Sequence, residues 1–245
     1  MVVSDGDTRI LIDAGITCKQ MTDRLEVLGI APKKLSGICL THDHVDHIKG
    51  VSTFCKNYGT PLYASLGTRD AAIYRLRDLD DAKWFEFAPG DGVGIGALSL
   101  MSFAVPHDAG DPVGFTIRGD GRCLGIATDL GYIPAMVERH LKACHALVLE
   151  SNHDVEMLMR SDYPWQNKER IKGRHGHLSN TQCTDTLENI LPGVLSTLVL
   201  AHISENTNTP TLAQNNAKKL LNRFGVAERV ALHVASPDAT GWLKV

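Results

Sequence analysis

The sequence has 245 residues, of which 43% are hydrophobic and 22% are charged, which is the composition of an ordinary globular protein. No apolar run approaches the roughly 20 residues of a membrane-spanning helix, and no signal-peptide pattern is visible at the start. The formal net charge is −3, so a nucleic-acid site would have to be a local basic patch. The six cysteines are scattered without a CxxC motif, which indicates reduced thiols and a cytoplasmic location.

The first part of the chain alternates predicted strands and helices. Apolar periodicity predicts strands at 8–13, 37–40 and 61–64, and helices at 19–28 and 68–79. Another helix is expected from the apolar spacing between Ile48 and Tyr58. Between 84 and 129 dense glycines and short apolar runs predict successive strands, with a hairpin turn at 119–121.

The alternation returns in the second part of the chain. Helices are expected at 134–141, 180–191 and 211–224, and strands at 146–150, 197–200 and 230–234. Two strand-rich stretches with helices outside them predict an α/β sandwich. No linker interrupts the pattern, so we expect one domain over residues 1–245.

The segment 41–50, THDHVDHIKG, places three histidines and two aspartates within six residues, between a buried strand and a helix. His42 and His44 are two residues apart in extended chain and project to the same side. Asp46 and His47 follow after the chain turns, where they can reach a second ion. Imidazole and carboxylate ligands suit zinc, manganese or iron(II). The segment therefore predicts a metal site.

Three later polar residues also follow apolar strands. These are His107 in AVPHDAG, Asp129 in IATDLG and His202 in LVLAHIS. Each alone is compatible with a structural role, but together with the first motif they complete a ligand set for two ions. Two ions that share a hydroxide are the usual machinery for hydrolysis of phosphoesters or amides.

This set resembles the metallo-β-lactamase-fold hydrolases over nearly the whole chain. The resemblance implies an αββα sandwich with the site at one edge between the sheets. It also implies that His42, His44 and His107 hold one ion, that Asp46, His47 and His202 hold the other, and that Asp129 bridges them.

Longer motifs resemble the bacterial YycJ (WalJ) group, above all ESNHD at 150–154 and GHLSN at 176–180. That group is similar to ribonuclease Z in its active site, and its members are associated with 5′-to-3′ exonuclease action on DNA, mismatch repair and a cell-wall two-component system. Members usually carry a first strand and a Gly/Ser-rich turn before the position of Val2. We expect this chain to lack that strand.

The resemblance to ribonuclease Z assigns Glu150 and His177 to the leaving group. A carboxylate can orient a histidine and raise its pKa, so that it donates a proton to the departing oxygen. The alternative is that His177 caps the helix that begins near 179, although Ser179 or Asn180 would cap it better. His153 and His175 are further candidates for substrate contact, whereas His140, His145 and His233 are interpreted as structural or surface residues.

A basic run precedes GHLSN and comprises Lys168, Arg170, Lys172 and Arg174, with one acidic residue among them. The hypothesis is that this run contacts a phosphate backbone, and that Tyr163 and Trp165 stack on bases. The alternatives are a solvated loop for the basic run and core packing for Trp165.

These motifs predict a metal-dependent phosphodiesterase, namely a 5′-to-3′ DNA exonuclease of the YycJ type. Its binuclear site would hold two divalent ions, either zinc or manganese, with iron as a further option. Its partner is nucleic acid rather than a membrane. Three alternatives stay open. They are a small-molecule hydrolase such as a thioesterase or lactonase, a ribonuclease Z-like RNA-processing enzyme, and a non-enzymatic partner in cell-wall signalling.

Overall fold

The computed structural model describes residues 1–76, 78–236 and 241–245. The chain forms two compact units, one of Met1–Ala104 with Ala109–Asp120 and the other of Val105–Asp108 with Gly121–Val245. Among the described residues no helix combines the length and the apolar character that a membrane crossing requires.

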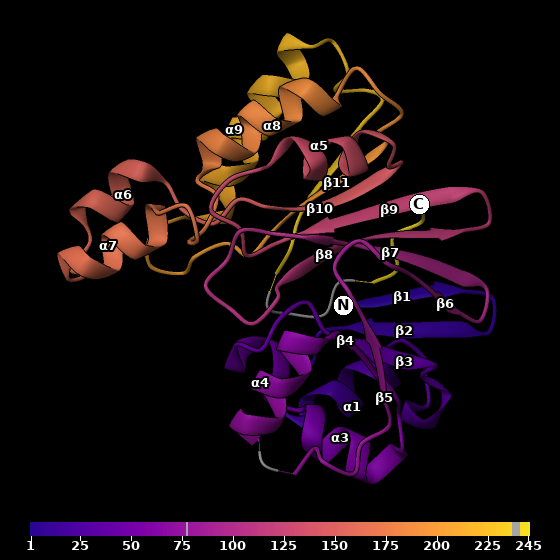
Figure 1. Ribbon diagram of the computed structural model, residues 1–245. Helices are drawn as coiled ribbons and strands as arrows, with labels where there is room; N and C mark the ends of the chain where they lie inside the picture. The colour runs from indigo at the N-terminus through magenta and orange to yellow at the C-terminus, as the bar shows by residue number, and fades with distance from the viewer. Residues whose placement is uncertain (77, 237–240) are drawn as a thin grey trace. The chain divides into compact units, whose positions relative to one another are not determined.

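The first unit contains a five-stranded sheet in the order β1-β2-β3-β4-β5 (Figure 1). The strands are β1 (Val2–Asp5), β2 (Thr8–Ile12), β3 (Gly37–Cys39), β4 (Leu62–Ser65) and β5 (Trp84–Phe87). β1 pairs with β2 in antiparallel fashion, and every other pair is parallel. Parallel strands end at the same edge of a sheet, so residues that follow them are brought together there.

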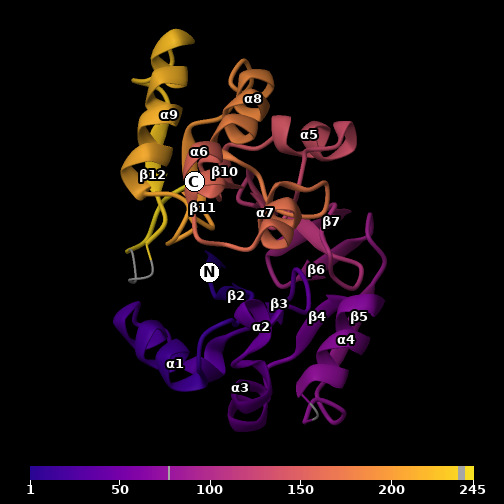
Figure 2. The ribbon, with the colours of Figure 1, turned by 90° about the vertical axis from the view of Figure 1, so that its left-hand side faces the viewer.

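Helices α1 (Cys18–Val27), α3 (Val51–Tyr58) and α4 (Leu66–Leu76) lie on one side of this sheet in both views (Figures 1 and 2). A short 3₁₀ helix, Pro32–Lys34, connects α1 to β3. Buried side chains of the helices, such as Leu25 and Phe54, pack in one core with Ile38 and Leu62 of the sheet. The core thereby fixes the ends of the strands.

One continuous helix between Ile48 and Tyr58 was predicted, but the structure has two helices with a break between them. A short helix, α2 (Val45–Ile48), precedes α3, and Gly50 stands between them. A Cβ at Gly50 would lie 2.2 Å from the backbone oxygen of Ile16. The chain turns where only glycine allows this close approach.

The glycine-rich stretch forms strands, as predicted. In the first unit β6 (Gly92–Ile95), β7 (Leu98–Ala104) and β8 (Val113–Gly119) pair as successive antiparallel neighbours. Asp120 and Gly121, both with positive φ, separate β8 from β9 (Arg122–Ala127). This is the conformation that a tight turn needs at these positions.

The second unit is built on parallel strands in the order β12-β11-β10-β9. They are β9, β10 (Ala146–Glu150), β11 (Thr197–Ala201) and β12 (Ala231–Val234). Helices α5 (Ala135–Lys142), α8 (Asn180–Ile190) and α9 (Pro210–Arg223) pack next to one another beside these strands (Figures 1 and 2). The three helices and β10–β12 lie within a few residues of their predicted bounds, and β9 falls in the stretch predicted to form strands.

Two helices between β10 and α8 were not predicted. They are α6 (Val155–Arg160) and α7 (Trp165–Lys172), which lie together at the edge of the second unit, away from α5, α8 and α9 (Figure 1). α6 buries only Leu158, and α7 buries none of its residues. Without an apolar stripe, neither helix has the periodicity that identifies a helix in sequence.

Candidate active site

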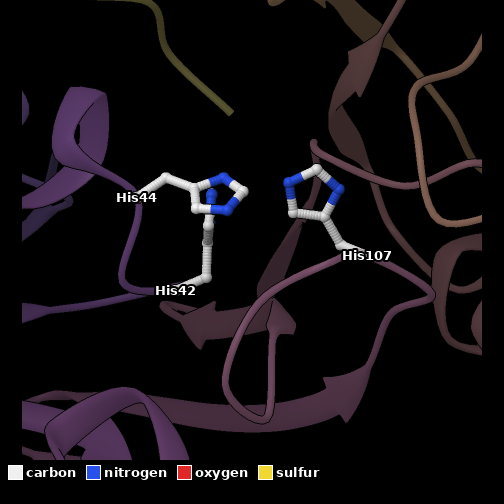
Figure 3. A group of neighbouring side chains, drawn as sticks. All are labelled: His42, His44 and His107. Atoms are coloured by element: carbon white, nitrogen blue, oxygen red, sulfur yellow. The ribbon is translucent and has the colours of Figure 1, made fainter. Parts of the chain in front are cut away.

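The first unit presents its predicted ligands on the loop that follows β3 and at the start of α2. Figure 3 shows the imidazoles of His42 and His44 on this loop, with their ring centroids 4.6 Å apart. The ring of His47 lies 4.0 Å from that of His42, centroid to centroid. Asp46 joins them, since one carboxylate oxygen is 3.6 Å from His47 Nε2. The motif thus gathers its four predicted ligands.

Asp13, which no sequence motif identified, holds this loop in place. Its carboxylate accepts hydrogen bonds from the backbone N–H and the hydroxyl of Thr41, both at 2.8 Å. The Nδ1 atom of His47 lies 2.8 Å from the same carboxylate. With Nδ1 bonded to Asp13, Nε2 is the nitrogen that His47 would offer to a metal ion.

Gly15, in the segment LIDAG at 11–15, also contacts this loop. A Cβ at this position would lie 1.4 Å from the backbone oxygen of Asp46, so only glycine allows the two backbone segments to approach this closely. The backbone N–H of Ala14 also donates to the carbonyl of His47 at 2.7 Å. The residues that follow β2 therefore pack against the loop and support it.

Asp43, between two predicted ligands, has a different role. Its side chain is 2% exposed, and its carboxylate accepts hydrogen bonds from Arg75 Nε at 2.6 Å and from the backbone N–H of Gly110 at 2.9 Å. Asp43 thus ties the loop to α4 and to the segment that follows His107 in the chain.

The second unit gathers another group of ionisable side chains at the carboxyl ends of β9, β10 and β11. Asp129, Glu150, His177 and His202 each offer one ligand atom, and these atoms all lie within 4.8 Å of one another. Asp129 and His202 both have positive φ, which directs them sharply out of their strands. A group of this composition suits a divalent ion or acid–base chemistry.

Glu150 lies at the centre of this group and is fully buried. One carboxylate oxygen is 2.9 Å from His177 Nδ1 and 2.7 Å from His202 Nδ1, and the other accepts the backbone N–H groups of Leu130 and Leu178. Burial raises the pKa of Glu150, but the hydrogen bonds and charges of His177 and His202 outweigh burial and hold it well below its usual range. Glu150 is therefore an ionised acceptor for two histidines.

His177 does not cap the following helix. Ser179 is the N-cap of α8, and its hydroxyl accepts from the N–H of Gln182 while the Gln182 side chain accepts from Ser179 in a capping box. His177 instead points to Glu150, and it lies 3.7 Å from Asp129. The alternative role for His177 is wrong, and its hydrogen bond is the one that a proton donor needs.

His107, the third residue labelled in Figure 3, follows β7 in sequence and belongs to the second unit. Its side chain is buried, and Nδ1 lies 3.2 Å from the carbonyl oxygen of Gly176, just before His177. Nε2 lies 4.0 Å from Asp129. As at His47, the contact at Nδ1 makes Nε2 the nitrogen that would bind a metal ion.

The predicted substrate residues have distinct surroundings. Arg170 Nε donates to Asp108 at 2.6 Å, and the guanidinium of Arg174 lies 4.4 Å above the ring of Tyr132. His175 is exposed, whereas His153 is buried, and burial lowers the pKa of His153 to about 4. The two arginines and His175 are thus the more accessible of the four.

Two other predictions concern the basic run and the remaining histidines. Lys168 Nζ donates to the carbonyl oxygens of Met159 and Ser161, so it ties α7 to the end of α6. His145 is structural, as interpreted from the sequence, because its Nδ1 accepts the backbone N–H of Cys123 and its carbonyl accepts that of Ser196.

Comparison with known proteins places this arrangement in a family. Residues 8–203 match the beta-lactamase superfamily domain, and the chain belongs to this superfamily. The metallo-β-lactamase-fold protein YhfI of Bacillus subtilis has a TM-score of 0.70 at 18% identity over 96% of this chain and 87% of its own. For the short form of human tRNase Z the TM-score is 0.64 at 16% identity, over 96% and 88%. The predicted fold class is confirmed.

Two curated relatives are more similar in sequence. The exodeoxyribonuclease YycJ of Bacillus anthracis is 32% identical over 97% of this chain and 90% of its own length. The exodeoxyribonuclease WalJ of Streptococcus pneumoniae is 31% identical over 94% and 87%. The resemblance to the YycJ (WalJ) group is confirmed. The metallo-β-lactamase fold implies divalent metal ions, and both units carry candidate ligands.

Proposed function

We propose that the chain is a metal-dependent phosphodiesterase that removes nucleotides from DNA in the 5′-to-3′ direction. The observation that carries this proposal is 32% identity with an exodeoxyribonuclease over almost the full length of both chains. The hydrogen-bonded pair of Glu150 and His177 supports it, because hydrolysis of a phosphodiester needs a proton donor for the leaving oxygen. The cytoplasmic location remains a prediction from the scattered cysteines.

The proposed ligands follow the order of the family's motifs along the chain. His42, His44 and His107 would hold one divalent ion, Asp46, His47 and His202 the other, and Asp129 both. The residues suit this role. In both His47 and His107 the Nδ1 atom already has a hydrogen-bond partner, so Nε2 remains to bind a metal ion. Imidazole with carboxylate favours zinc or manganese, with iron as a further option.

When bound, divalent ions lower the pKa of a water molecule towards neutrality and neutralise charge on the phosphoryl oxygens. Asp46, whose side chain lies beside His47, would also accept a proton from the attacking water. Glu150 bonds Nδ1 of His177, so Nε2 is left to carry the proton that goes to the 3′ oxygen of the leaving group.

Substrate binding is proposed for the residues around this pair. Arg170, Arg174 and His175 are exposed and can meet backbone phosphates, which bind arginine well. His153 is the fourth candidate and stays a prediction, although its burial points to a contact with the site rather than with the backbone.

The test is cleavage of 5′- and 3′-labelled single- and double-stranded DNA and RNA, with manganese or zinc added. We expect stepwise loss of nucleotides from the 5′ end of DNA. His42→Ala and His177→Ala should each reduce the rate roughly a hundredfold or more, through loss of a ligand and of the proton donor respectively. His140→Ala, a histidine outside the proposed site, should cleave like wild type.

Absence of cleavage of every substrate by the metal-loaded wild type would refute the nuclease. Equal rates for wild type and His42→Ala would do the same, because they would locate the observed cleavage in a contaminant. Cleavage of RNA alone would replace the DNA exonuclease with the RNA-processing alternative.

A further inference from the structure

The α6–α7 pair, residues 155–172, is a surface feature of which the proposed function uses only Arg170. Lys168 joins its two helices, since its ammonium group donates to two carbonyl oxygens at the end of α6. The pair leaves large apolar side chains in solvent. Trp165 is 56% exposed, Val155 48% and Met159 38%. Three such residues on two adjacent short helices indicate a contact surface.

The α6–α7 pair is attached to the proposed site at its C-terminal end. Arg170 of α7 is ion-paired with Asp108, the neighbour of His107. Four residues after α7 ends, the carbonyl of Gly176 meets His107 Nδ1. Gly131, two residues after Asp129, packs against this connection, because a Cβ there would lie 2.3 Å from the backbone oxygen of Gly173. The C-terminal end of α7 is therefore connected to the segments that carry His107 and Asp129, two of the proposed metal ligands.

The charge of the surface indicates the chemistry of its partner. Residues 155–172 carry four basic and three acidic side chains, in a chain whose net charge is −3. Most of the basic groups interact within the protein, as Arg160 does with Glu156 and Arg170 with Asp108. Lys172 differs, because its ammonium group lies 5.0 Å above the centre of the exposed Trp165 ring.

Proteins that bind single-stranded nucleic acid combine solvent-exposed aromatic rings with cationic groups. A base stacks on the ring whatever its identity, and the cation meets the phosphate of the same nucleotide. A purely apolar partner would make no use of the charge of Lys172, and an acidic peptide would make no use of the Trp165 ring.

We propose that Trp165 and Lys172 bind the single-stranded part of a nucleic-acid substrate, with a base stacked on Trp165 and its phosphate paired with Lys172. The inference rests on the proposed nuclease function and adds to it a contact outside the predicted ligands. The contact is independent of base sequence, as suits an enzyme that removes successive nucleotides.

The first test is equilibrium binding of a fluorescent single-stranded oligonucleotide with phosphorothioate linkages, which slow its hydrolysis, to the metal-loaded protein. Trp165→Ala should weaken binding roughly tenfold through loss of one stacked base. Trp165→Phe should recover most of the affinity, whereas Trp165→Leu, apolar but without a ring, should not. Lys172→Gln should lower the slope of log K against log salt by about 0.7, as expected for one phosphate.

The control is Tyr74→Ala, which removes an aromatic side chain that is 86% exposed on α4 of the first unit and should bind like wild type. Wild-type affinity in Trp165→Ala or in Trp165→Leu would overturn the inference. So would a change in the oligomeric state of Trp165→Ala in light scattering, since it would show that the surface joins two copies of the chain.

A second test separates this inference from the proposed function. For Trp165→Ala, kcat/KM on the oligonucleotide should fall about tenfold more than kcat/KM on bis(p-nitrophenyl) phosphate, a diester too small to reach α7. Equal losses on the two substrates would overturn the contact but leave the phosphodiesterase. Trp165-dependent binding in a protein that hydrolyses neither diester would overturn the proposed function and keep the contact.

Discussion

At the scale of single residues, Asp43 shows how one motif serves two purposes. His42 and His44 on either side of it are predicted ligands, whereas Asp43 is buried in contact with Arg75 and the N–H of Gly110. An unpaired carboxylate would not be stable in this position, so the contacts make its burial possible. They also fix the segment that follows His107.

Asp43→Ala is expected to destabilise the protein by about 1–3 kcal/mol. The substitution leaves the partly buried N–H of Gly110 without its acceptor and removes the partner of Arg75. The loss should be smaller than for a fully buried ion pair, because the Arg75 side chain is 45% exposed. Urea denaturation followed by circular dichroism measures the change.

The matched control is Asp23→Ala, which removes the partner of Lys19 in an exposed pair on α1 and should leave the unfolding midpoint unchanged. If Asp43→Ala unfolded at the wild-type urea concentration, the contacts of Asp43 would have no structural importance.

The candidate ligands were predictable because each follows an apolar strand, and parallel strands deliver such residues to one edge of a sheet. Asp13 and Gly15 also follow a strand, but their roles were not found. Asp13 acts through His47, 34 positions away in sequence, and Gly15 through a close approach to Asp46. Such roles depend on contacts between segments that are far apart in the sequence, and hydrophobic periodicity gives no information on these contacts.

At the scale of elements, a buried network of amides joins three connections around Glu150. Asn208 Nδ2 donates to the carbonyl oxygens of Ser151 and Asn152, at 2.9 and 3.1 Å, and the side chains of Asn208 and Asn180 bond each other. Asn152 in turn donates to the carbonyl of His202 at 2.9 Å. Ser151 and Asn152 of ESNHD and Asn180 of GHLSN therefore have a structural role, because they hold the two segments together.

Asn208→Ala is expected to lower the free energy of unfolding by about 2–3 kcal/mol, because it leaves the buried carbonyl of Ser151 without its donor and removes the partner of the buried Asn180 amide. Asn208→Asp keeps the shape but loses the amide donor, so we expect a comparable loss. Thermal and urea unfolding measure both variants. Asn189→Ala, which removes an exposed amide bonded to Glu138, should unfold like wild type.

A wild-type midpoint for Asn208→Ala would show that the network adds nothing to stability. A large loss in Asn189→Ala as well would attribute the effect to any asparagine of this region rather than to the network.

Element prediction succeeded where helices bury a stripe and strands are continuously apolar. β10 is buried at all five positions, and α9 buries Ala213, Ala217, Leu220 and Leu221 along one face. It failed for β1, which is only partly buried, and for α6 and α7. α7 is held by Lys168 and Arg170 rather than by a core, and such contacts have no period in the sequence.

At the scale of the whole molecule, metal binding should stabilise the folded chain. A ligand that binds only the folded state at a hundredfold excess over its Kd contributes about 2.7 kcal/mol. For a chain of this size, this corresponds to a rise in Tm of about 5–10 °C. We therefore expect manganese or zinc to raise the Tm of chelator-treated protein in differential scanning fluorimetry.

The matched pair for this measurement is His42→Ala and His140→Ala. The first should lose much of the metal-dependent rise, and the second should retain it. An equal rise in both variants would mean that the ion binds elsewhere, and no rise in wild type would contradict a high-affinity metal centre.

One carboxylate oxygen of Glu150 meets both His177, the proposed proton donor, and His202, a proposed ligand. The proposed acid and the proposed metal ligand therefore share one anchor, and a substitution that shifts one imidazole should shift the other. Selection acting on metal preference must then also alter proton delivery. Relatives adapted to a different ion should carry compensating changes around Glu150 rather than at the ligands alone.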